Sequence, residues 1–398
     1  MRYRTFGGVL ATFFVAVTLA ALATGCGGAT QIVQIKALPA GQDRADFGLG
    51  PGVRPLSHGP GDKSAPAWNP TDERVAFVVD GYVVDKPLYN QDLRRWTTKD
   101  FGASRSEWRS SEGLTIFAES PSPDPEEPGS VYRTLPKDTP FGVEKIAAGA
   151  LAMSPGPGGE GLIVALETSP YESGIARIGG NGKMDQIYTN LIGGRVTGIS
   201  LSPNGGQVAV AARGAATVAL HVLDLATGDS KTIARLEPGM EIHGDPQWTR
   251  RGIYYVAGEE DTGESKLAPD HLYRVPAGSS TPEPAPGVGE DFVASSLRLS
   301  PNGERLAIVG RRNPASSTNL YILEPATDNL KAVTANEDME IKTGPYDLAW
   351  SASGDRMAIV ARGVISGPRV LSAPADTILT DFYNLYEVPI EAPEGDAP

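Results

Sequence analysis

The stretch Leu299-Ser-Pro-Asn-Gly-Glu-Arg-Leu-Ala-Ile-Val309 decides the fold. An apolar residue ends a short strand, Ser-Pro-Asn-Gly forms a tight turn, and a second apolar strand begins at once. Proline presets φ at the second turn position, and asparagine and glycine tolerate the left-handed conformation that follows. The stretch therefore predicts a β-hairpin.

The same hairpin recurs along the chain. Leu201-Ser-Pro-Asn-Gly-Gly-Gln-Val-Ala-Val210 is nearly identical, and Trp350-Ser-Ala-Ser-Gly-Asp-Arg-Met-Ala-Ile-Val360 is a degenerate copy. Seven units are found, spaced by roughly 40 to 51 residues, which is the period of a four-stranded propeller blade. We therefore predict an all-β chain that forms a seven-bladed β-propeller, rather than one of six or eight blades. The matching first-strand positions are Trp68, Trp108, Met153, Leu201, Trp248, Leu299 and Trp350.

The seventh unit supplies only three strands before the chain ends. A segment from the N-terminal side is therefore expected to complete the last blade and to remove the exposed edge of an open array. Residues Val53–Ser57 lie at a suitable distance before Trp68, and residues Gln31–Lys36 are the competing candidate. This places the propeller in residues 53–390, with a tether in residues 26–52 and a tail in residues 391–398.

Composition limits the classes of function. The 398 residues are 40% hydrophobic, enough for a sizeable core, and the net charge is −13. A nucleic-acid partner would require a basic face, so this acidic balance argues against one. An acidic excess chiefly favours solubility, with a preference for basic partners as the secondary interpretation.

The first 25 residues are expected to lie outside the fold. Arg2 and Arg4 form a short positive region, and an apolar run over residues 9–23 precedes Cys26, the only cysteine of the chain. This segment resembles a bacterial lipoprotein signal peptide, ending in Ala23-Thr24-Gly25-Cys26. The resemblance implies diacylglyceryl modification of Cys26 and a mature chain that begins there. A simple N-terminal membrane anchor is the alternative, and both place the remainder outside the cytoplasm.

The repeated unit, an apolar residue followed by Ser-Pro-Asn/Asp-Gly and then by an apolar strand, resembles the repeat of TolB-type, WD40-like propellers. The resemblance covers roughly residues 53 to 390, and LpqB-type lipoproteins carry a related propeller. It implies a ring that presents its rim and central channel to protein partners in the cell envelope. Because the repeated positions are turn and core residues, the tryptophans are interpreted as packing residues.

Residues for catalysis are scarce. Modification of Cys26 would leave no free thiol, and the histidines at positions 58, 221, 243 and 271 show no spacing typical of a metal site. A Gly-x-Ser-x-Gly nucleophile elbow is absent from the sequence. The sequence therefore predicts no catalytic residue, no metal and no cofactor.

Two patterns need a separate interpretation. Gly156-Pro-Gly-Gly-Glu-Gly161 matches a dinucleotide-binding motif literally, but a strand rather than a helix is expected after it, so it predicts an enlarged hairpin turn. Asp245, Asp291 and Asp347 lie near first strands and could line the channel mouth, where paired carboxylates would suit glycoside chemistry. Solvated loop ends are the preferred interpretation of these acids.

The hypothesis from the sequence is an extracytoplasmic, membrane-anchored propeller that binds an envelope protein as a scaffold and is not an enzyme. The alternative from another class is a hydrolase or lyase that acts on a sugar or lactone in the central channel.

Overall fold

The computed structural model describes residues 53–390 except 58–59, 89–92, 111–112, 120–126, 136–140, 157–160, 170–171, 216, 260–269, 337–338 and 364–381. The chain divides into two compact units, residues 1–41 and residues 42–398. Every described residue belongs to the second unit. The expected signal peptide, Cys26, Gln31–Lys36 and the tail after residue 390 lie outside the described residues.

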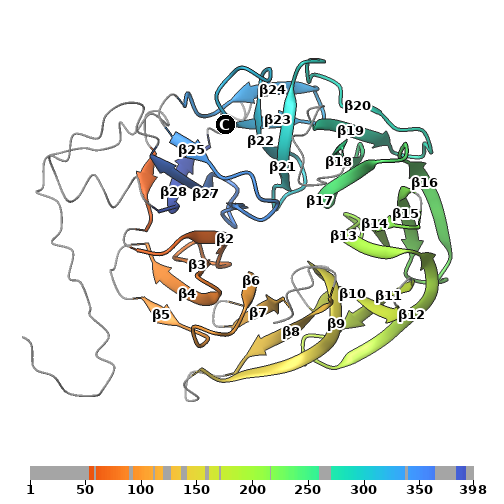
Figure 1. The fold of residues 1–398 in the computed structure, drawn as a ribbon, viewed down its shortest axis with the longest axis horizontal. Coiled ribbons are helices and arrows are strands. Elements are labelled where there is room, and N and C mark those ends of the chain that lie inside the picture. Colours follow the sequence, from red (N-terminus) through yellow and green to blue (C-terminus); the bar gives the residue numbers. More distant parts are fainter. Residues whose placement is uncertain are drawn as a thin grey trace, which may run out of the picture. The chain divides into compact units, whose positions relative to one another are not determined.

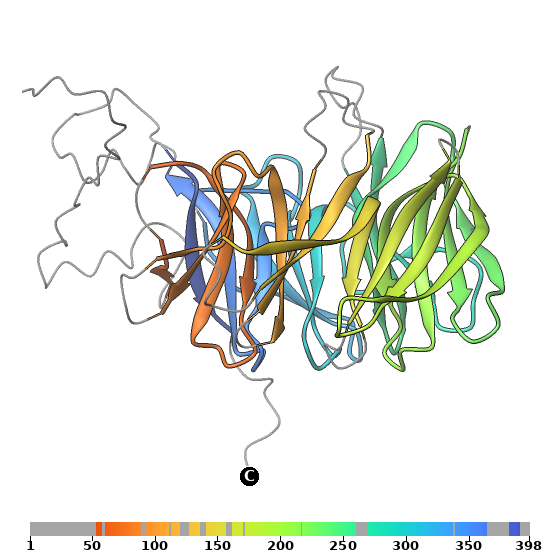
Figure 2. The same cartoon turned by 90° about the horizontal axis from the view of Figure 1, so that it is seen from below.

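Six antiparallel sheets form from the described residues, and helices are absent from this part of the chain. Within the second unit the sheets stand side by side around a central axis (Figures 1 and 2). Four sheets have four strands each. They contain β2 (Lys63–Trp68), β3 (Arg74–Val79), β4 (Tyr82–Pro87) and β5 (Arg94–Arg95); β13 (Arg195–Leu201), β14 (Gln207–Arg213), β15 (Val218–Asp224) and β16 (Ser230–Arg235); β17 (Met240–Thr249), β18 (Gly252–Glu259), β19 (His271–Pro276) and β20 (Glu283–Pro284); and β21 (Val293–Leu299), β22 (Leu306–Arg311), β23 (Asn319–Glu324) and β24 (Asn329–Ala332).

The remaining sheets have seven and five strands. In the seven-stranded sheet, the first half of the 13-residue β9 pairs with β8 and the second half pairs with β10. One strand thus joins two groups of strands that the repeat pattern assigns to separate units. This sheet contains β6 (Ala103–Ser110), β7 (Gly113–Ala118), β8 (Gly129–Thr134), β9 (Val143–Pro155), β10 (Leu162–Ser169), β11 (Glu172–Ile178) and β12 (Met184–Gly193).

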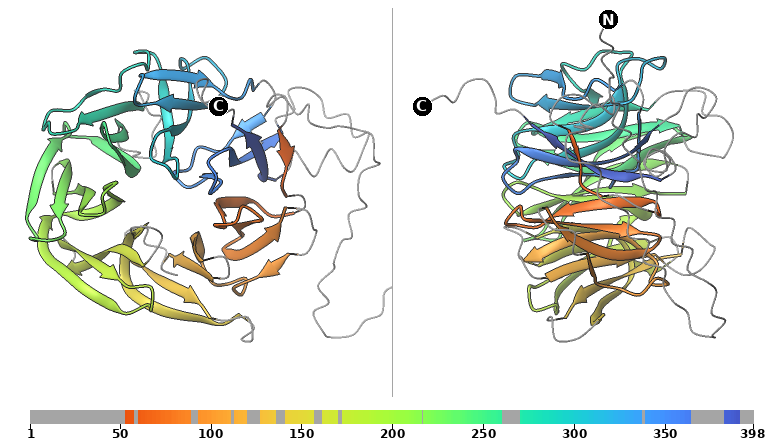
Figure 3. Two further views of the ribbon diagram at one scale, coloured as in Figure 1. Left: turned by 180° about the vertical axis from the view of Figure 1, so that it is seen from behind. Right: turned by 90° about the vertical axis from the view of Figure 1, so that its left-hand side faces the viewer.

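The five-stranded sheet joins the two ends of the described chain. It contains β25 (Met339–Ile341), β26 (Leu348–Trp350), β27 (Arg356–Gly363), β28 (Asn384–Pro389) and β1 (Arg54–Pro55). Strand β1 pairs with β28, with Arg54 opposite Glu387, and the two side chains form an ion pair at 2.8 Å. Figure 3 shows the orange β1 beside the dark blue β28. Of the two candidate closing segments, Val53–Ser57 is therefore the one that the structure pairs with the last sheet.

The turn after Leu299 explains why its sequence repeats. The Ser300 hydroxyl accepts the Arg305 N–H at 2.9 Å and donates to Asn302 Oδ1 at 2.7 Å, while Gly303 adopts φ +75°. In the copy that starts at Leu201, the Ser202 hydroxyl makes the same pair of bonds. Serine thus holds the turn closed, and glycine supplies the positive φ that it requires.

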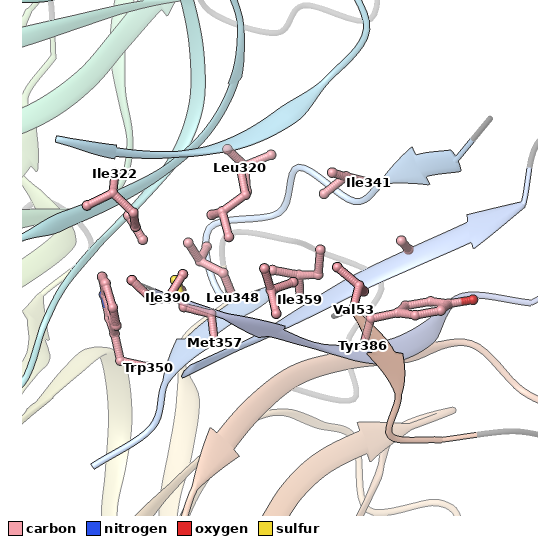
Figure 4. Packing of buried hydrophobic residues seen from close by; sticks show 14 of the residues in the cluster. Val53, Leu320, Ile322, Ile341, Leu348, Trp350, Met357, Ile359, Tyr386 and Ile390 are labelled. Carbon is pink, nitrogen blue, oxygen red and sulfur yellow. The ribbon is translucent and has the colours of Figure 1, made fainter. Parts of the chain in front are cut away.

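Apolar side chains pack between neighbouring sheets rather than into one central core. Figure 4 shows Leu320 and Ile322 of β23 over Met357 and Ile359 of the next sheet. Burial of each such side chain contributes about 1.5–3 kcal/mol to the free energy of unfolding. Because the apolar packing lies between the sheets, the first strands can carry polar side chains toward the axis.

Candidate functional site

The first strands of the sheets, among them β2, β6, β13, β17 and β21, lie nearest the middle of the ring (Figure 1). Two cavities are lined by these strands. The wide cavity, about 590 Å³, is lined by residues near the starts of the strands, such as Ser64, Ser104 and Arg195. The narrow cavity, about 290 Å³, is lined by residues near the strand ends, such as Leu299 and Trp350.

A central ion cluster stands between the two cavities. It consists of Arg105 and Glu107 from β6, Asp245 from β17, Arg298 from β21 and Tyr346 from the segment before β26. Arg105 contacts Asp245 at 3.1 Å and Glu107 at 3.0 Å, while Arg298 contacts Glu107 at 2.7 Å. The Arg105 guanidinium also lies over the Tyr346 ring, 4.2 Å from its centroid.

The cluster balances its own charges. Two guanidinium groups face two carboxylates, so the group is neutral when all four are ionised. Burial alone would raise the pKa of Glu107, but the guanidinium groups of Arg298 and Arg105 outweigh burial and hold that pKa below its ordinary value. Burial, together with the nearby Asp245 carboxylate, raises the pKa of Tyr346 to about 12, which keeps its phenol protonated. Glu107 is therefore ionised and paired at neutral pH, beside a neutral Tyr346.

Two of the three aspartates singled out from the sequence are structural supports. Asp245 Oδ1 accepts the N–H of Ile199 at 3.1 Å, and Asp347 Oδ1 accepts the N–H of Ala65 at 3.2 Å. Each bond joins the first strand of one sheet to an element of another sheet. The preferred interpretation as solvated loop ends is wrong for both residues, since they are 8% and 5% exposed, whereas Asp291 is exposed as expected.

Two cationic side chains, Arg195 and Lys342, line the wide cavity. Arg195 is 23% exposed and bonds to Glu167 at 3.1 Å, and Lys342 is 31% exposed and lies 3.6 Å from Asp347. Burial raises the pKa of Asp347, while Lys342 and the Ala65 N–H act in the opposite direction. The exposed carboxylates of Glu119 and Glu127 line the same cavity.

The tryptophans of the first strands pack as the sequence predicts. Trp68 and Trp350 are 7% exposed, and the indole N–H of Trp350 donates to the Arg298 carbonyl at 3.0 Å. Trp108 makes the equivalent bond to the Ala67 carbonyl at 2.9 Å. The indole N–H of Trp68 is buried and has no hydrogen-bond partner in the described part of the chain.

The histidines lie apart. His221 bonds to Thr232 at 3.2 Å, and His243 lies 3.3 Å from Asp270. His271 begins β19, and His58 lies outside the described residues. Across the described ranges, no group of three or more His, Cys, Asp or Glu side chains is placed to hold a metal ion.

The glycine-rich motif lies in a hairpin. Strands β9 and β10 pair antiparallel, with Pro155 opposite Leu162, and the Gly156 N–H donates to the Gly161 carbonyl at 3.1 Å. Strand β10, rather than a helix, follows the motif as predicted, while residues 157–160 lie outside the described residues.

Sequence reasoning missed the central ion cluster, although a signal for it exists. In three of the repeat units, the residue just before the matching tryptophan or leucine is a charged or amide residue. Glu107, Gln247 and Arg298 hold this position and line the narrow cavity. This position would have drawn attention to Glu107 and Arg298 of the cluster, but not to Arg105, Asp245 or Tyr346.

No family model matches the chain, and neither does any curated protein. Solved structures do match. The β-propeller domain of the trilobed protease from Pyrococcus furiosus has a TM-score of 0.51 at 11% identity, over 76% of this chain and 92% of that one. Oligogalacturonate lyase from Vibrio parahaemolyticus has a TM-score of 0.54 at 10% identity, over 85% and 93%.

TolB from Acinetobacter baumannii matches with a TM-score of 0.42 at 13% identity, over 85% of this chain and 78% of that one, a likeness too weak to carry an argument. Within the described residues, no helix is both long and apolar enough to cross a membrane. At such low identities the structural matches establish the fold alone. The chain is an all-β propeller of antiparallel sheets.

Proposed function

We propose that this chain is an extracytoplasmic binding module that holds an envelope protein at its wide cavity. The observation that carries the proposal is the central ion cluster. The cluster holds its charges in pairs between the first strands, while the wide cavity beside it is open and is lined by both apolar and charged residues. A site of about 590 Å³ lies within the range of ligand-binding pockets.

The inner carboxylates favour binding over catalysis. Glycoside hydrolysis uses one carboxyl as an acid and another as a base or nucleophile, both able to reach the substrate. Asp245 is held by Arg105 and the Ile199 N–H, and Asp347 by the Ala65 N–H. Each carboxylate already has a structural task, so a hydrolase or lyase is the less well supported reading.

We further propose that the ring has seven blades. In this reading β9 serves as the outer strand of one blade and as the inner strand of the next. The seven-stranded sheet is then two blades that share one strand.

The anchor is the third part of the proposal. Modification of Cys26 would hold the ring at a membrane surface, in line with the resemblance of residues 1–26 to a lipoprotein signal peptide. Phase partitioning in Triton X-114 tests this part. The full chain is expected in the detergent phase, and Cys26→Ala is expected in the aqueous phase or uncleaved. Equal partitioning of both chains would refute the lipid anchor.

Affinity capture tests the binding proposal. The tagged full chain is recovered from detergent-solubilised envelopes alongside two variants, Ser104→Trp in the wide cavity and Lys183→Trp on an exposed turn. A specific partner is expected with the native chain and with Lys183→Trp, and is expected to be lost with Ser104→Trp. Capture of no specific partner by the native chain, together with measurable turnover of a sugar or lactone, would refute the proposal.

A further inference from the structure

We propose that the wide cavity recognises a carboxylate on an extended peptide segment, and that Arg195 and Lys342 supply the hydrogen-bond donors. The inference rests on the proposed function, because it names the chemistry of the segment that the binding module takes. The carboxylate belongs either to a chain terminus or to an acidic side chain.

The Arg195 side chain uses one of its five N–H donors in the hydrogen bonds of the described residues. Its guanidinium lines the cavity and, among the described residues, its side chain donates to one carboxylate, from Nη1 to Glu167 Oε1 at 3.1 Å. A guanidinium carries five N–H donors in a planar fork that matches a carboxylate. The side chain is also partly desolvated, at 23% exposure, which strengthens a charged hydrogen bond relative to one in water.

Lys342 is held loosely. Its Nζ lies 3.6 Å from Asp347 Oδ2, beyond hydrogen-bond distance, and 5.5 Å from the centroid of the Tyr383 ring. The other oxygen of Asp347 accepts the N–H of Ala65. An ammonium group has three donors and no acceptor, so a carboxylate that enters the cavity offers Lys342 a better partner than it now has.

The remaining walls select a peptide rather than a small anion. Phe117 and Leu151, both partly exposed, supply apolar surface in the same cavity as the two cations. The exposed carboxylates of Glu119 and Glu127 would repel a doubly charged phosphate and attract a basic side chain further along the same segment. The walls therefore favour a segment that carries a carboxylate, an apolar side chain and a basic group.

Fluorescence anisotropy with three labelled peptides tests the inference on the full chain in detergent. The probes are fluorescein-Gly-Gly-Ala-Arg-Ala-Leu-Ala with a free terminal carboxylate, the same peptide as its terminal amide, and the amide with glutamate in place of leucine. The free acid or the glutamate peptide is expected to bind at least about tenfold more tightly than the plain amide. Which of the two binds identifies the source of the carboxylate.

Substitutions of the two cationic residues test whether they bind the peptide carboxylate. Arg195→Gln and Lys342→Met are each expected to weaken the carboxylate peptide about tenfold and to leave the amide unchanged, whereas Arg251→Gln, on an exposed turn, should change neither. Equal binding of all three probes, binding of none, or equal effects of the three substitutions would overturn the inference. If the double variant Arg195→Gln/Lys342→Met still captures the envelope partner, the proposed function stands and the carboxylate inference fails.

Discussion

The substitution Glu107→Gln removes one negative charge from the central ion cluster and keeps the shape of the side chain. Glu107 pairs with Arg298 at 2.7 Å and with Arg105 at 3.0 Å, and it is 19% exposed. Loss of the charge leaves two guanidinium groups facing Asp245 alone. Breaking a buried ion pair costs about 3–5 kcal/mol, and the lower value suits glutamine because its oxygen still accepts a hydrogen bond.

The expected shift in the unfolding midpoint follows from this energy. An unfolding entropy of about 2 cal/mol/K per residue, over a ring of this size, converts about 3 kcal/mol into about 4 °C. Glu237→Gln, on an exposed loop, is the matched control and should shift the midpoint by less than about 1 °C. Thermal unfolding followed by tryptophan fluorescence measures both variants.

The effect of Glu107→Gln also depends on pH. The pKa of Glu107 is lower in the folded chain than in the unfolded chain, so its contribution to stability is present above the unfolded value of about 4.5. That contribution is lost as pH falls through the folded pKa. The native chain and Glu107→Gln are therefore expected to differ most near pH 7 and to converge as the pH falls below 4.5 through the lower, folded pKa. A difference that is absent at pH 7, or that does not change with pH, would refute the role given to the cluster.

Three further pairs of substitutions test the fold. Trp108→Phe should lower stability by about 1–3 kcal/mol because the Ala67 carbonyl loses its donor, whereas Trp68→Phe, whose indole N–H has no partner among the described residues, should cost clearly less in urea unfolding. Arg356→Ala should destabilise the ring more than Arg251→Ala on an exposed turn, because Arg356 joins Asp72 of the first sheet to Glu387 of the last, at 3.8 and 3.9 Å; equal midpoints in calorimetry would contradict this. Gly252→Ala should prevent folding or lower the yield sharply, since its φ is +144° and a Cβ would lie 2.2 Å from the Val275 carbonyl oxygen, while Gly206→Ala should express normally.

The sequence predicts the ring well because its architecture is local. The Ser-Pro-Asn-Gly turn after Leu299 needs only neighbouring residues to form, and its recurrence counts the units. The closing strand required one further inference, that an unfinished last unit needs a partner from the N-terminal side. Pairing of Arg54 with Glu387 bears this out.

The centre of the ring is far harder to predict. Arg105 and Asp245 are 140 residues apart and meet only because the ring closes. A carboxylate in a strand looks the same in the sequence whether it is solvated or buried against a guanidinium. For this reason Asp245 and Asp347 were expected at solvated loop ends, whereas the structure uses both to join sheets.

The binding residues of the wide cavity are equally hard to predict from the sequence. Its cations, Arg195 and Lys342, come from strands and loops of different sheets, and neither lies in a motif. Their relevance depends on spare hydrogen-bond donors, which is a property of the folded geometry. The loops and first strands that do not repeat are therefore where function must be sought.

Site-specific photo-crosslinking in native envelopes tests the central claim most directly. Benzoylphenylalanine is placed at the exposed Glu119 on the wall of the wide cavity, or at Asn302 in an exposed turn beside the narrow cavity. The account predicts one specific crosslinked protein from position 119, none from position 302, and loss of the product in chains that carry the probe at position 119 together with Arg195→Gln and Lys342→Met. A specific product from position 302 alone, or none from either position, would contradict a binding module that works through its wide cavity.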